Sequence, residues 1–405
     1  MKRFFLLVTL LTPFFARTQA QTPAAAPATR APTGLSAATA AIPTAAAATP
    51  ATAAAWQKQA TEPYRGKQDD ICFVTPEQGW YVNGAGKIFG TRNGGQSWQK
   101  LFEKPGTFFR CVAFIDSLRG FAGNIGTQYF PGVTDTIPLY ATKDGGRSWA
   151  PVKYKGPTVK GLCALDIVKE QFINAGNIDY RYHIFGGGRV GGPGFLLHSP
   201  DNGDTWTSRD LRPFGAEFIL DIKMFNPREG FICAGSNPDV AKANALMLET
   251  KDGGLTWTKR YQSQRPYEIT WKQSWPTRQT GYATVQSYNP DTLVAQRYVV
   301  KTTNGGRTWK ELPLIKNAKV REFGLAFADE QTGWVGAVPG GFGTRDGGRT
   351  WAPVQFGPAV NKIRVVRTPD GGYVAYAIGV GVYKLNVAGA AAPGKDAPRG
   401  RKGKG

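Results

Sequence analysis

The chain has 405 residues and a formal charge of +21, with 50 lysine and arginine residues against 29 acidic ones. This basic balance favours anionic partners, but no nucleic-acid-binding motif occurs, so we expect no nucleic acid among them. The four cysteines and two histidines show no spacing that fits a metal site, and we predict neither a metal nor another cofactor.

The first 20 residues are typical of a secretory signal peptide. Lys2 and Arg3 form the charged start, an apolar run follows at 4–15, and Thr18-Gln19-Ala20 is a plausible cleavage site. The apolar run is too short for a membrane span. We therefore predict export to the periplasm or the extracellular space, with no transmembrane segment in the mature chain.

Two low-complexity segments flank the rest of the chain. Residues 21–55 are almost wholly Ala, Pro and Thr, and such a stretch cannot bury enough apolar surface to offset its ordering entropy. Residues 388–405 are rich in Ala, Gly and Pro and then in Lys and Arg. We predict a disordered linker, a folded part at 56–387 that keeps most of the positive charge, and a disordered basic tail.

One eight-residue motif occurs six times in the folded part. It reads Ser/Thr, any residue, Asp/Asn, Gly/Asn, Gly, any residue, Ser/Thr, Trp, and successive copies are 42 to 57 residues apart, which indicates a repeat architecture. Asp or Asn before Gly predicts a tight hairpin turn, and the Trp offers a large apolar face to bury between sheets. We interpret these residues as structural: Asn93, Trp98, Asp144, Trp149, Asp201, Trp206, Asp252, Trp257, Asn304, Trp309, Asp346 and Trp351.

This motif resembles the Asp-box, or bacterial neuraminidase repeat, of β-propeller proteins. Each repeat also holds an apolar strand, a polar turn ending in Gly-aromatic, and further short strands, four in all. We predict an all-β fold, a seven-bladed β-propeller of four-stranded antiparallel blades. The blades are expected near 68–103, 107–155, 158–212, 215–262, 265–313, 318–356 and 358–387.

The seventh unit has three strands and no box. Trp56-Gln57-Lys58 copies Trp98-Gln99-Lys100, the strand after the first box. We therefore predict that the N-terminal strand closes the last blade, because closure protects sheet edges. The alternative is a six-bladed ring in which Trp56 is a chance aromatic.

Strand order places the box turns on one face and the second-to-third loops on the other. On that second face blades 2 to 5 carry insertions, near 124–138, 177–194, 236–244 and 286–296, and long loops on a rigid scaffold commonly carry binding. Within them, Gly186 to Gly192 is expected to be a flexible loop tip and no phosphate site, because it lacks the Lys-Ser/Thr ending. Aromatic and Arg side chains anchor interfaces, so we predict binding by Tyr129, Phe130, Tyr180, Arg181, Tyr182 and Arg189, with His183 and Tyr288 beside them.

The innermost strands start on this same face. Their first residues form a ring of mixed charge around the channel mouth, which is either a solvated rim or the docking site for an acidic segment of a partner. The ring consists of Asp70, Arg110, Lys160, Asp221, Glu268, Arg321 and Lys362.

The four cysteines are Cys72, Cys111, Cys163 and Cys233. Three of them occupy like positions in successive repeats, and equivalent strands of different blades are not usually at disulfide distance. We expect buried free thiols, with disulfides as the alternative in an exported protein.

Uniform boxes, basic charge, export and single-propeller length resemble the photosystem II stability/assembly factor family, a group tied to photosynthesis. The resemblance implies a non-enzymatic propeller that binds a protein partner, such as a membrane-protein complex, and the charge also suits an anionic envelope surface. We expect a monomer. The alternative is a secreted glycoside hydrolase or carbohydrate-binding propeller, for which Asp70, Asp221 and Glu268 are the candidate carboxylates. A sialidase is improbable because no Arg-Ile/Leu-Pro tripeptide occurs.

Overall fold

The computed structural model describes residues 55–389. The predicted signal peptide, and nearly all of the predicted linker and tail, lie outside these residues. Within them, no helix has the length and apolar character that crossing a membrane requires. The helices there are short 3-10 turns, η2 at Arg212–Phe214 and η3 at Val240–Lys242.

The strands form seven sheets of four antiparallel strands each. In blades 1 to 3 the strands run outward from the innermost one in sequence order. They are β2 (Gln68–Phe73), β3 (Gly79–Asn83), β4 (Lys87–Thr91) and β5 (Gln99–Glu103); β6 (Phe109–Phe114), β7 (Gly120–Asn124), β8 (Leu139–Thr142) and β9 (Ala150–Pro151); and β10 (Ala164–Asn174), β11 (Asn177–Gly188), β12 (Phe195–Ser199) and β13 (Thr207–Asp210).

Blades 4 to 6 repeat this order, and blade 7 departs from it. The strands are β14 (Phe218–Met224), β15 (Gly230–Gly235), β16 (Ala245–Thr250) and β17 (Thr258–Gln262); β18 (Glu268–Ser274), β19 (Gly281–Ser287), β20 (Gln296–Thr302) and β21 (Lys310–Lys316); β22 (Arg321–Phe327), β23 (Gly333–Val338), β24 (Gly341–Thr344) and β25 (Ala352–Pro353); and, in blade 7, β26 (Val360–Arg367), β27 (Tyr373–Gly379), β28 (Val382–Val387) and β1 (Gln57–Lys58).

The last blade is closed by the first strand of the chain. In β1, Gln57 pairs with Lys384 of β28 and Lys58 pairs with Tyr383. The preceding residue, Trp56, packs edge-on against Trp334 of blade 6, with the ring centroids 5.6 Å apart. The prediction that the N-terminal strand completes blade 7 is confirmed, and the six-bladed alternative is wrong.

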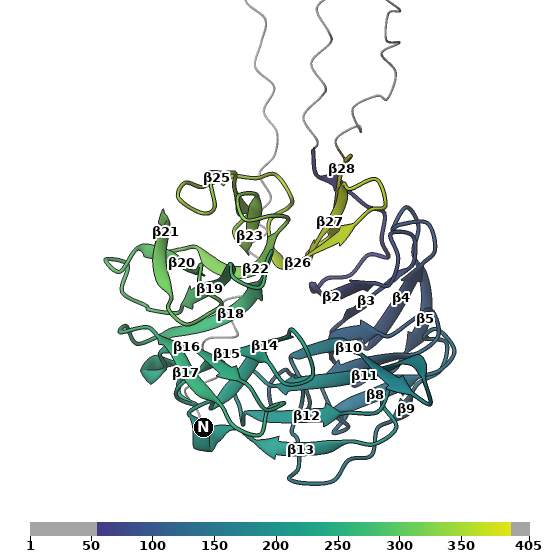
Figure 1. Ribbon diagram of the computed structural model, residues 1–405. Helices are drawn as coiled ribbons and strands as arrows, with labels where there is room; N and C mark the ends of the chain where they lie inside the picture. The colour runs from purple at the N-terminus through teal and green to yellow at the C-terminus, as the bar shows by residue number, and fades with distance from the viewer. Residues whose placement is uncertain (1–54, 390–405) are drawn as a thin grey trace, which may run out of the picture. The chain divides into compact units, whose positions relative to one another are not determined.

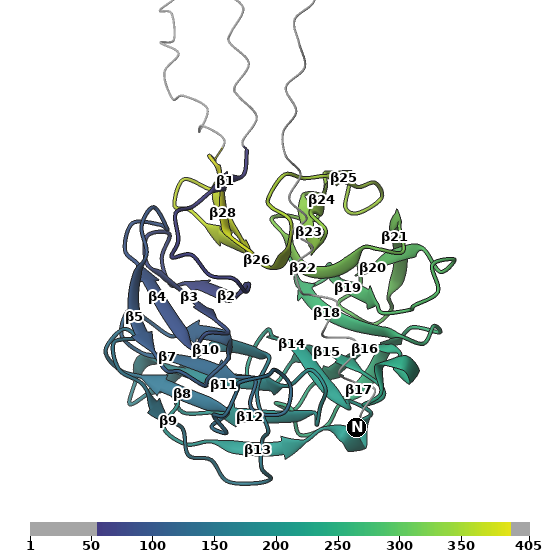
Figure 2. The same cartoon turned by 180° about the vertical axis from the view of Figure 1, so that it is seen from behind.

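The seven sheets form a closed ring around a central axis (Figures 1 and 2). Each innermost strand contacts the innermost strand of the next blade, and β26 contacts β2. The apolar core lies between neighbouring sheets; one cluster, for example, joins Phe121 of blade 2 to Leu165 and Trp206 of blade 3. We call the face that carries the box turns the box face, and the opposite face the mouth face.

The boxes close their hairpins with side-chain hydrogen bonds. In the last box the Thr344 hydroxyl donates to Asp346 Oδ1 at 2.8 Å and accepts the N–H of Gly348 at 3.0 Å. Oδ1 of Asp346 also accepts the N–H of Thr350 at 3.0 Å. Gly347 and Gly348 have φ of 73° and 83°, a region that favours glycine. Equivalent bonds recur in the other five boxes.

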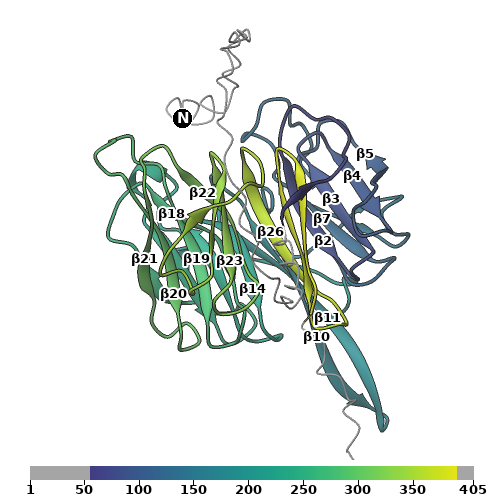
Figure 3. The same ribbon diagram turned by 90° about the horizontal axis from the view of Figure 1, so that it is seen from above.

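The predicted insertion at 177–194 is mostly not a loop. Residues 177–188 form β11, which pairs with β10 along its whole length, up to Asn174 and Asn177. The turn between these strands, Ala175 and Gly176, has φ of 47° and 82°, as a two-residue hairpin turn requires. Because this is a first-to-second turn, the hairpin extends beyond the box face, as Figure 3 shows. The placement of Tyr180, Arg181 and Tyr182 on the mouth face is therefore wrong.

The expected flexible tip at 186–192 is also wrong in its first half. Gly186 to Gly188 are buried strand residues paired with β12. A Cβ on Gly188 would lie 1.9 Å from the carbonyl oxygen of Gly161, and one on Gly187 would lie 2.7 Å from Ile219 of blade 4. The glycines are needed because neighbouring chain segments approach this closely.

The four cysteines are free thiols, three of them buried and Cys72 half-buried. Burial, the largest influence, raises the pKa of Cys72 to about 12. These side chains pack as small apolar groups.

Candidate binding site at the channel mouth

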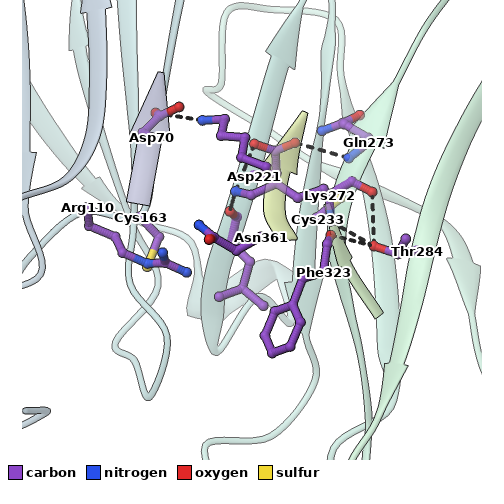
Figure 4. Close-up of polar contacts among 12 residues, drawn as sticks. Asp70, Arg110, Cys163, Asp221, Cys233, Lys272, Gln273, Thr284, Phe323 and Asn361 are labelled. Carbon is purple, nitrogen blue, oxygen red and sulfur yellow. Dashed lines mark hydrogen bonds and ion pairs between the residues drawn. The ribbon is translucent and has the colours of Figure 1, made fainter. Parts of the chain in front are cut away.

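Carboxylates in the channel wall connect neighbouring blades. Asp70 of β2 accepts the N–H of Val112 in blade 2 at 3.0 Å and forms an ion pair with Lys362 of blade 7 at 2.6 Å. Asp221 of β14 likewise accepts the N–H of Gln273 in blade 5 at 3.0 Å and pairs with Lys272 at 3.2 Å. Figure 4 shows Asp221 with Lys272 and Gln273. Such bonds hold the innermost strands of successive blades together.

The wall ion pairs are buried, and burial shifts the pKa values of the side chains that form them. Burial raises the pKa of Asp70, but the charges of Lys362 and Arg364 outweigh that effect and the net pKa is lowered. Burial first, and the charge of Arg364 second, lower the pKa of Lys362 to about 8.

Three residues of the predicted mouth ring belong to this wall. Asp70, Asp221 and Lys362 are 0%, 8% and 3% exposed. They do not form a solvated rim, because the innermost strands continue past them toward the mouth face. Truncating one partner of such a buried pair would leave an uncompensated charge, so we assign them to blade closure and not to partner binding.

Nearer the mouth face, cations and aromatic rings from several blades meet. Arg110 of β6 forms an ion pair with Asp69 of β2 and lies over the ring of Trp271 in β18, 5.6 Å from its centroid. Lys67 lies 5.0 Å from the ring centroid of Phe323 in β22, and the Trp271 and Phe323 rings are 5.1 Å apart, edge to face. Asn361 of β26 joins this group by donating to the Asp69 carbonyl at 2.9 Å. We call these six residues the mouth cluster.

The mouth cluster holds polar atoms without partners. Trp271 Nε1, Asp69 Oδ2 and Asn361 Oδ1 make no hydrogen bond within the described part of the chain, although each is shielded from solvent. Buried polar groups are nearly always satisfied in folded proteins. One free donor and two free acceptors, carried by one connected cluster, match a ligand that both accepts and donates hydrogen bonds.

The cluster also has a surplus of positive charge. Burial first, and the neighbouring charge of Arg110 second, lower the pKa of Lys67 to about 8, although Asp69 attracts the proton. Lys67 is partly exposed at the mouth. An anionic group beside Lys67 and Arg110 would relieve this repulsion, so the site favours a carboxylate.

The other predicted ring residues are spread around the mouth. Lys160 is exposed in the segment before β10. Arg321 is half-buried, donates to the Ala318 carbonyl at 2.9 Å, and lies 6.0 Å from the Tyr288 ring centroid. Glu268 is buried and paired with Arg265 at 2.6 Å. Of the predicted ring residues, only Lys160 and Arg321 therefore offer charge at the surface of the mouth.

Of the predicted loop residues, Tyr129 and Phe130 lie at the mouth. Both are half-buried and pack on the apolar cluster that contains Trp271 and Phe323. Arg189 is buried, and donates to the Ile125 and Thr127 carbonyls at 3.1 and 2.6 Å. It holds the loop after β7 in place and is not available to a partner.

Sequence reasoning missed five members of the mouth cluster: Lys67, Asp69, Trp271, Phe323 and Asn361. Two signals were present: the acidic pair Asp69-Asp70 at the start of an apolar strand, and large aromatics within three residues of the strand starts at Glu268 and Arg321. Their meeting depends on which strands face each other across the ring, which no single repeat encodes.

Fold and boxes together define the class of this protein as a BNR-type, seven-bladed β-propeller. Residues 214–385 match the family described as Photosynthesis system II assembly factor YCF48, and the chain resembles that assembly factor. No curated protein sequence matches the chain.

Solved structures with the same fold include two of YCF48. The structure described as YCF48 bound to D1 peptide is 17% identical, with a TM-score of 0.57, and the match covers 84% of this chain and 99% of that one. YCF48 from Cyanidioschyzon merolae is 14% identical, with a TM-score of 0.55 and coverage of 82% and 98%. The GH74 xyloglucanase from Xanthomonas campestris is 15% identical, with a TM-score of 0.56, covering 84% of this chain and 55% of that one. These similarities show that the chain shares the fold of these proteins.

Proposed function

We propose that this chain is an exported, non-enzymatic propeller that binds a carboxylate-bearing peptide segment of a protein partner at the channel mouth. The observation that carries the proposal is the mouth cluster, where Lys67 and Arg110 stand beside Trp271 and Phe323 with unpartnered polar atoms. A peptide supplies both N–H and C=O groups to such atoms, and its side chains can pack on the rings.

Two similarities support a protein ligand. The family matched by residues 214–385 is an assembly factor, and one relative of the same fold was solved with a peptide of D1. The proposal extends to a partner of that kind, a segment of a membrane-protein complex, without requiring a photosystem.

The test is a titration of the full chain with fluorescent peptides. The D1 peptide, and a pool of random ten-residue peptides, would each be offered with a free and with an amidated C-terminus. We expect binding to be weakened roughly tenfold by Lys67→Met and by Lys160→Glu with Arg321→Glu, because each removes favourable charge at the mouth. Lys251→Glu, at an exposed position in the box of blade 4 on the opposite face, is the matched control. Equal affinity of all variants would reject the site.

The runner-up is a glycoside hydrolase, since the xyloglucanase shares the fold. Its candidate carboxylates, Asp70, Asp221 and Glu268, are each paired with a lysine or arginine. A hydrolysis screen over plant and bacterial polysaccharides separates the two functions, and turnover of any glycoside would show that the non-enzymatic proposal is wrong.

A further inference from the structure

A β-hairpin projects from blade 3 on the side opposite the mouth (Figure 3). Tyr182 exchanges two hydrogen bonds of 2.9 Å with Asn202 in the box turn, which marks the level of the box face. From there, six residues lead to the turn at Gly176, a reach of roughly 20 Å at about 3.3 Å per residue. We call residues 169–182 the hairpin arm.

The exposed apolar side chains of the arm lie on one of its two sides. Ile173 pairs directly with Ile178, and Gln171 pairs with Tyr180, so these side chains share one side of the ribbon. Ile173, Ile178 and Tyr180 are 79%, 62% and 45% exposed. The other side carries the ion pair between Glu170 and Arg181, at 3.6 Å, and the half-buried Phe172, whose ring centroid lies 4.7 Å from the Arg181 guanidinium. An isolated two-stranded hairpin is marginally stable in water, so a bare apolar side indicates that something covers it.

Exposed apolar side chains gather near the arm. Among the residues that the structure describes, seven large hydrophobic side chains are exposed, and five of them lie on the box-face side of blades 2, 3 and 4. Besides the three on the arm, they are Leu118 in the first turn of blade 2 and Leu255 in the box of blade 4.

Unpaired cations surround these apolar residues. Lys143, Arg147, Arg228 and Lys251 are exposed in the turns of blades 2 and 4, and no ion pair involves them within residues 55–389. On the arm itself, the Lys169 ammonium lies 3.4 Å from the Tyr180 ring centroid. In the nearby boxes, the carboxylates of Asp144, Asp201 and Asp252 accept hydrogen bonds from their own turns. Asp204 and, on the arm, Asp179 are exposed without an ion pair among the described residues, but the unpaired cations outnumber them. The surface therefore complements a negatively charged one.

We propose that the hairpin arm and the surrounding box-face turns form a docking surface for an anionic lipid bilayer. Isoleucine at a projecting tip, tyrosine behind it and lysine or arginine at its base are the residue types that insert at, and anchor to, a membrane interface. The three exposed arm side chains supply roughly a few hundred Å² of apolar surface, well below what a stable dimer interface needs, which disfavours a second copy of the chain.

The backbone limits how far the arm enters the bilayer. Strand β10 pairs only with β11, and β11 pairs with β12 only from Ile184 onward, so both outer edges of the arm carry unpaired peptide groups. Unpaired peptide groups are costly in hydrocarbon, so insertion stops in the headgroup region, roughly 5–10 Å deep. The mouth face, on the opposite side of the ring, then stays open to a partner.

The test is co-sedimentation of the full chain with vesicles of phosphatidylcholine alone or with 30 mol% phosphatidylglycerol. The wild type should bind the anionic vesicles, and Ile173→Ser with Ile178→Ser should lower its partition coefficient roughly tenfold or more. Lys143→Glu with Lys251→Glu should also weaken binding and reduce its dependence on salt. The controls Leu293→Ser, at an 89% exposed apolar residue of the mouth face, and Lys319→Glu should behave as the wild type.

A second readout locates the contact. An environment-sensitive fluorophore on Ala175→Cys at the turn should shift to the blue with anionic vesicles. Three results would each overturn the proposal: no binding to anionic vesicles, arm variants that bind like the wild type, or a probe that stays in water. Either of the last two would mean that another segment contacts the lipid, or that the arm contacts a protein. Peptide binding at the mouth should survive the arm variants, so the two proposals can fail separately.

Discussion

The guanidinium group of Arg110 lies over the indole ring of Trp271, 5.6 Å from its centroid. Arg110 belongs to blade 2 and Trp271 to blade 5, so this contact crosses the channel. It leaves Trp271 Nε1, a strong donor, without a partner in the described structure. The contact thus fixes an aromatic face and an unused N–H at the mouth.

Trp271→Phe tests whether this N–H serves a ligand. Phenylalanine keeps an aromatic face under Arg110 but removes the donor. We expect peptide affinity to fall roughly five- to tenfold, because a hydrogen bond to the ligand is lost. The thermal midpoint should fall as well, because the smaller ring leaves space in the apolar cluster that holds Trp271. Titration calorimetry and thermal unfolding measure the two effects. A large drop in stability with unchanged affinity would assign the indole to the core alone.

Lys67 predicts how binding depends on pH. Its pKa is lowered to about 8, so the ammonium loses its proton as pH rises through that value. We expect affinity for a peptide with a free carboxylate to fall between pH 7 and pH 9, with proton uptake on binding near pH 8, because the bound carboxylate favours the charged lysine.

Lys67→Arg is the matched control for that dependence. Arginine stays charged across this range, so the variant should bind with nearly constant affinity from pH 7 to pH 9. Calorimetry in two buffers of different ionisation enthalpy reports the proton uptake. A wild type and a variant with the same pH profile would remove Lys67 from the site.

Glu322 should make the stability of the fold depend on pH. Its side chain is fully buried in β22, and neither carboxylate oxygen has a partner among the described residues. The pKa of Glu322 is raised to about 8, and burial is the largest cause. The charges of Arg297 and Arg321 lower it, and the charge of Glu268 raises it. The folded pKa thus exceeds the unfolded one, so the contribution of Glu322 to stability is fully present below about pH 4.5 and is lost as pH rises to 8.

At pH 8, the free energy of unfolding of Glu322→Gln should therefore exceed that of the wild type by roughly 2–4 kcal/mol. The difference should be much smaller at pH 5. Urea unfolding at the two pH values measures the change. Comparing the variant with the wild type cancels the titration of the other groups. A difference that is the same at both pH values would show that Glu322 keeps its charge, with water or a ligand as its partner.

Thr344→Val tests the box as a structural element. Valine matches the shape of threonine but cannot bond Asp346 or accept the N–H of Gly348, which would be left buried without a partner. We expect a loss of about 1–2 kcal/mol in the free energy of unfolding. Thr303→Val, at an exposed position of the fifth box, should cost much less. Equal losses in the two variants would contradict the assigned role of the Thr344 hydroxyl.

Features that depend on local chain chemistry could be predicted from the sequence. Ser/Thr, Asp/Asn and Gly at fixed offsets define a turn within eight residues, and the copy of Trp98-Gln99-Lys100 at Trp56 revealed the closing strand. The alternation of Ile178, Tyr180, Tyr182 and Ile184 is also a local signal for a strand, and it explains why this segment forms β11 and not the predicted loop.

The sequence by itself determined the repeat, the number of blades and the closure of the ring, because each rests on hydrogen bonds and side-chain patterns a few residues long. Only the tertiary structure decided which charges are used up in the channel wall and which remain at the mouth. Asp69 and Asp70 are neighbours in sequence, yet Asp70 pairs with Lys362 of blade 7 and Asp69 with Arg110 of blade 2. A bulge between Gln68 and Asp70 interrupts the regular strand pairing there, and ring closure brings Lys362 and Arg110 from the two neighbouring blades to meet the two carboxylates.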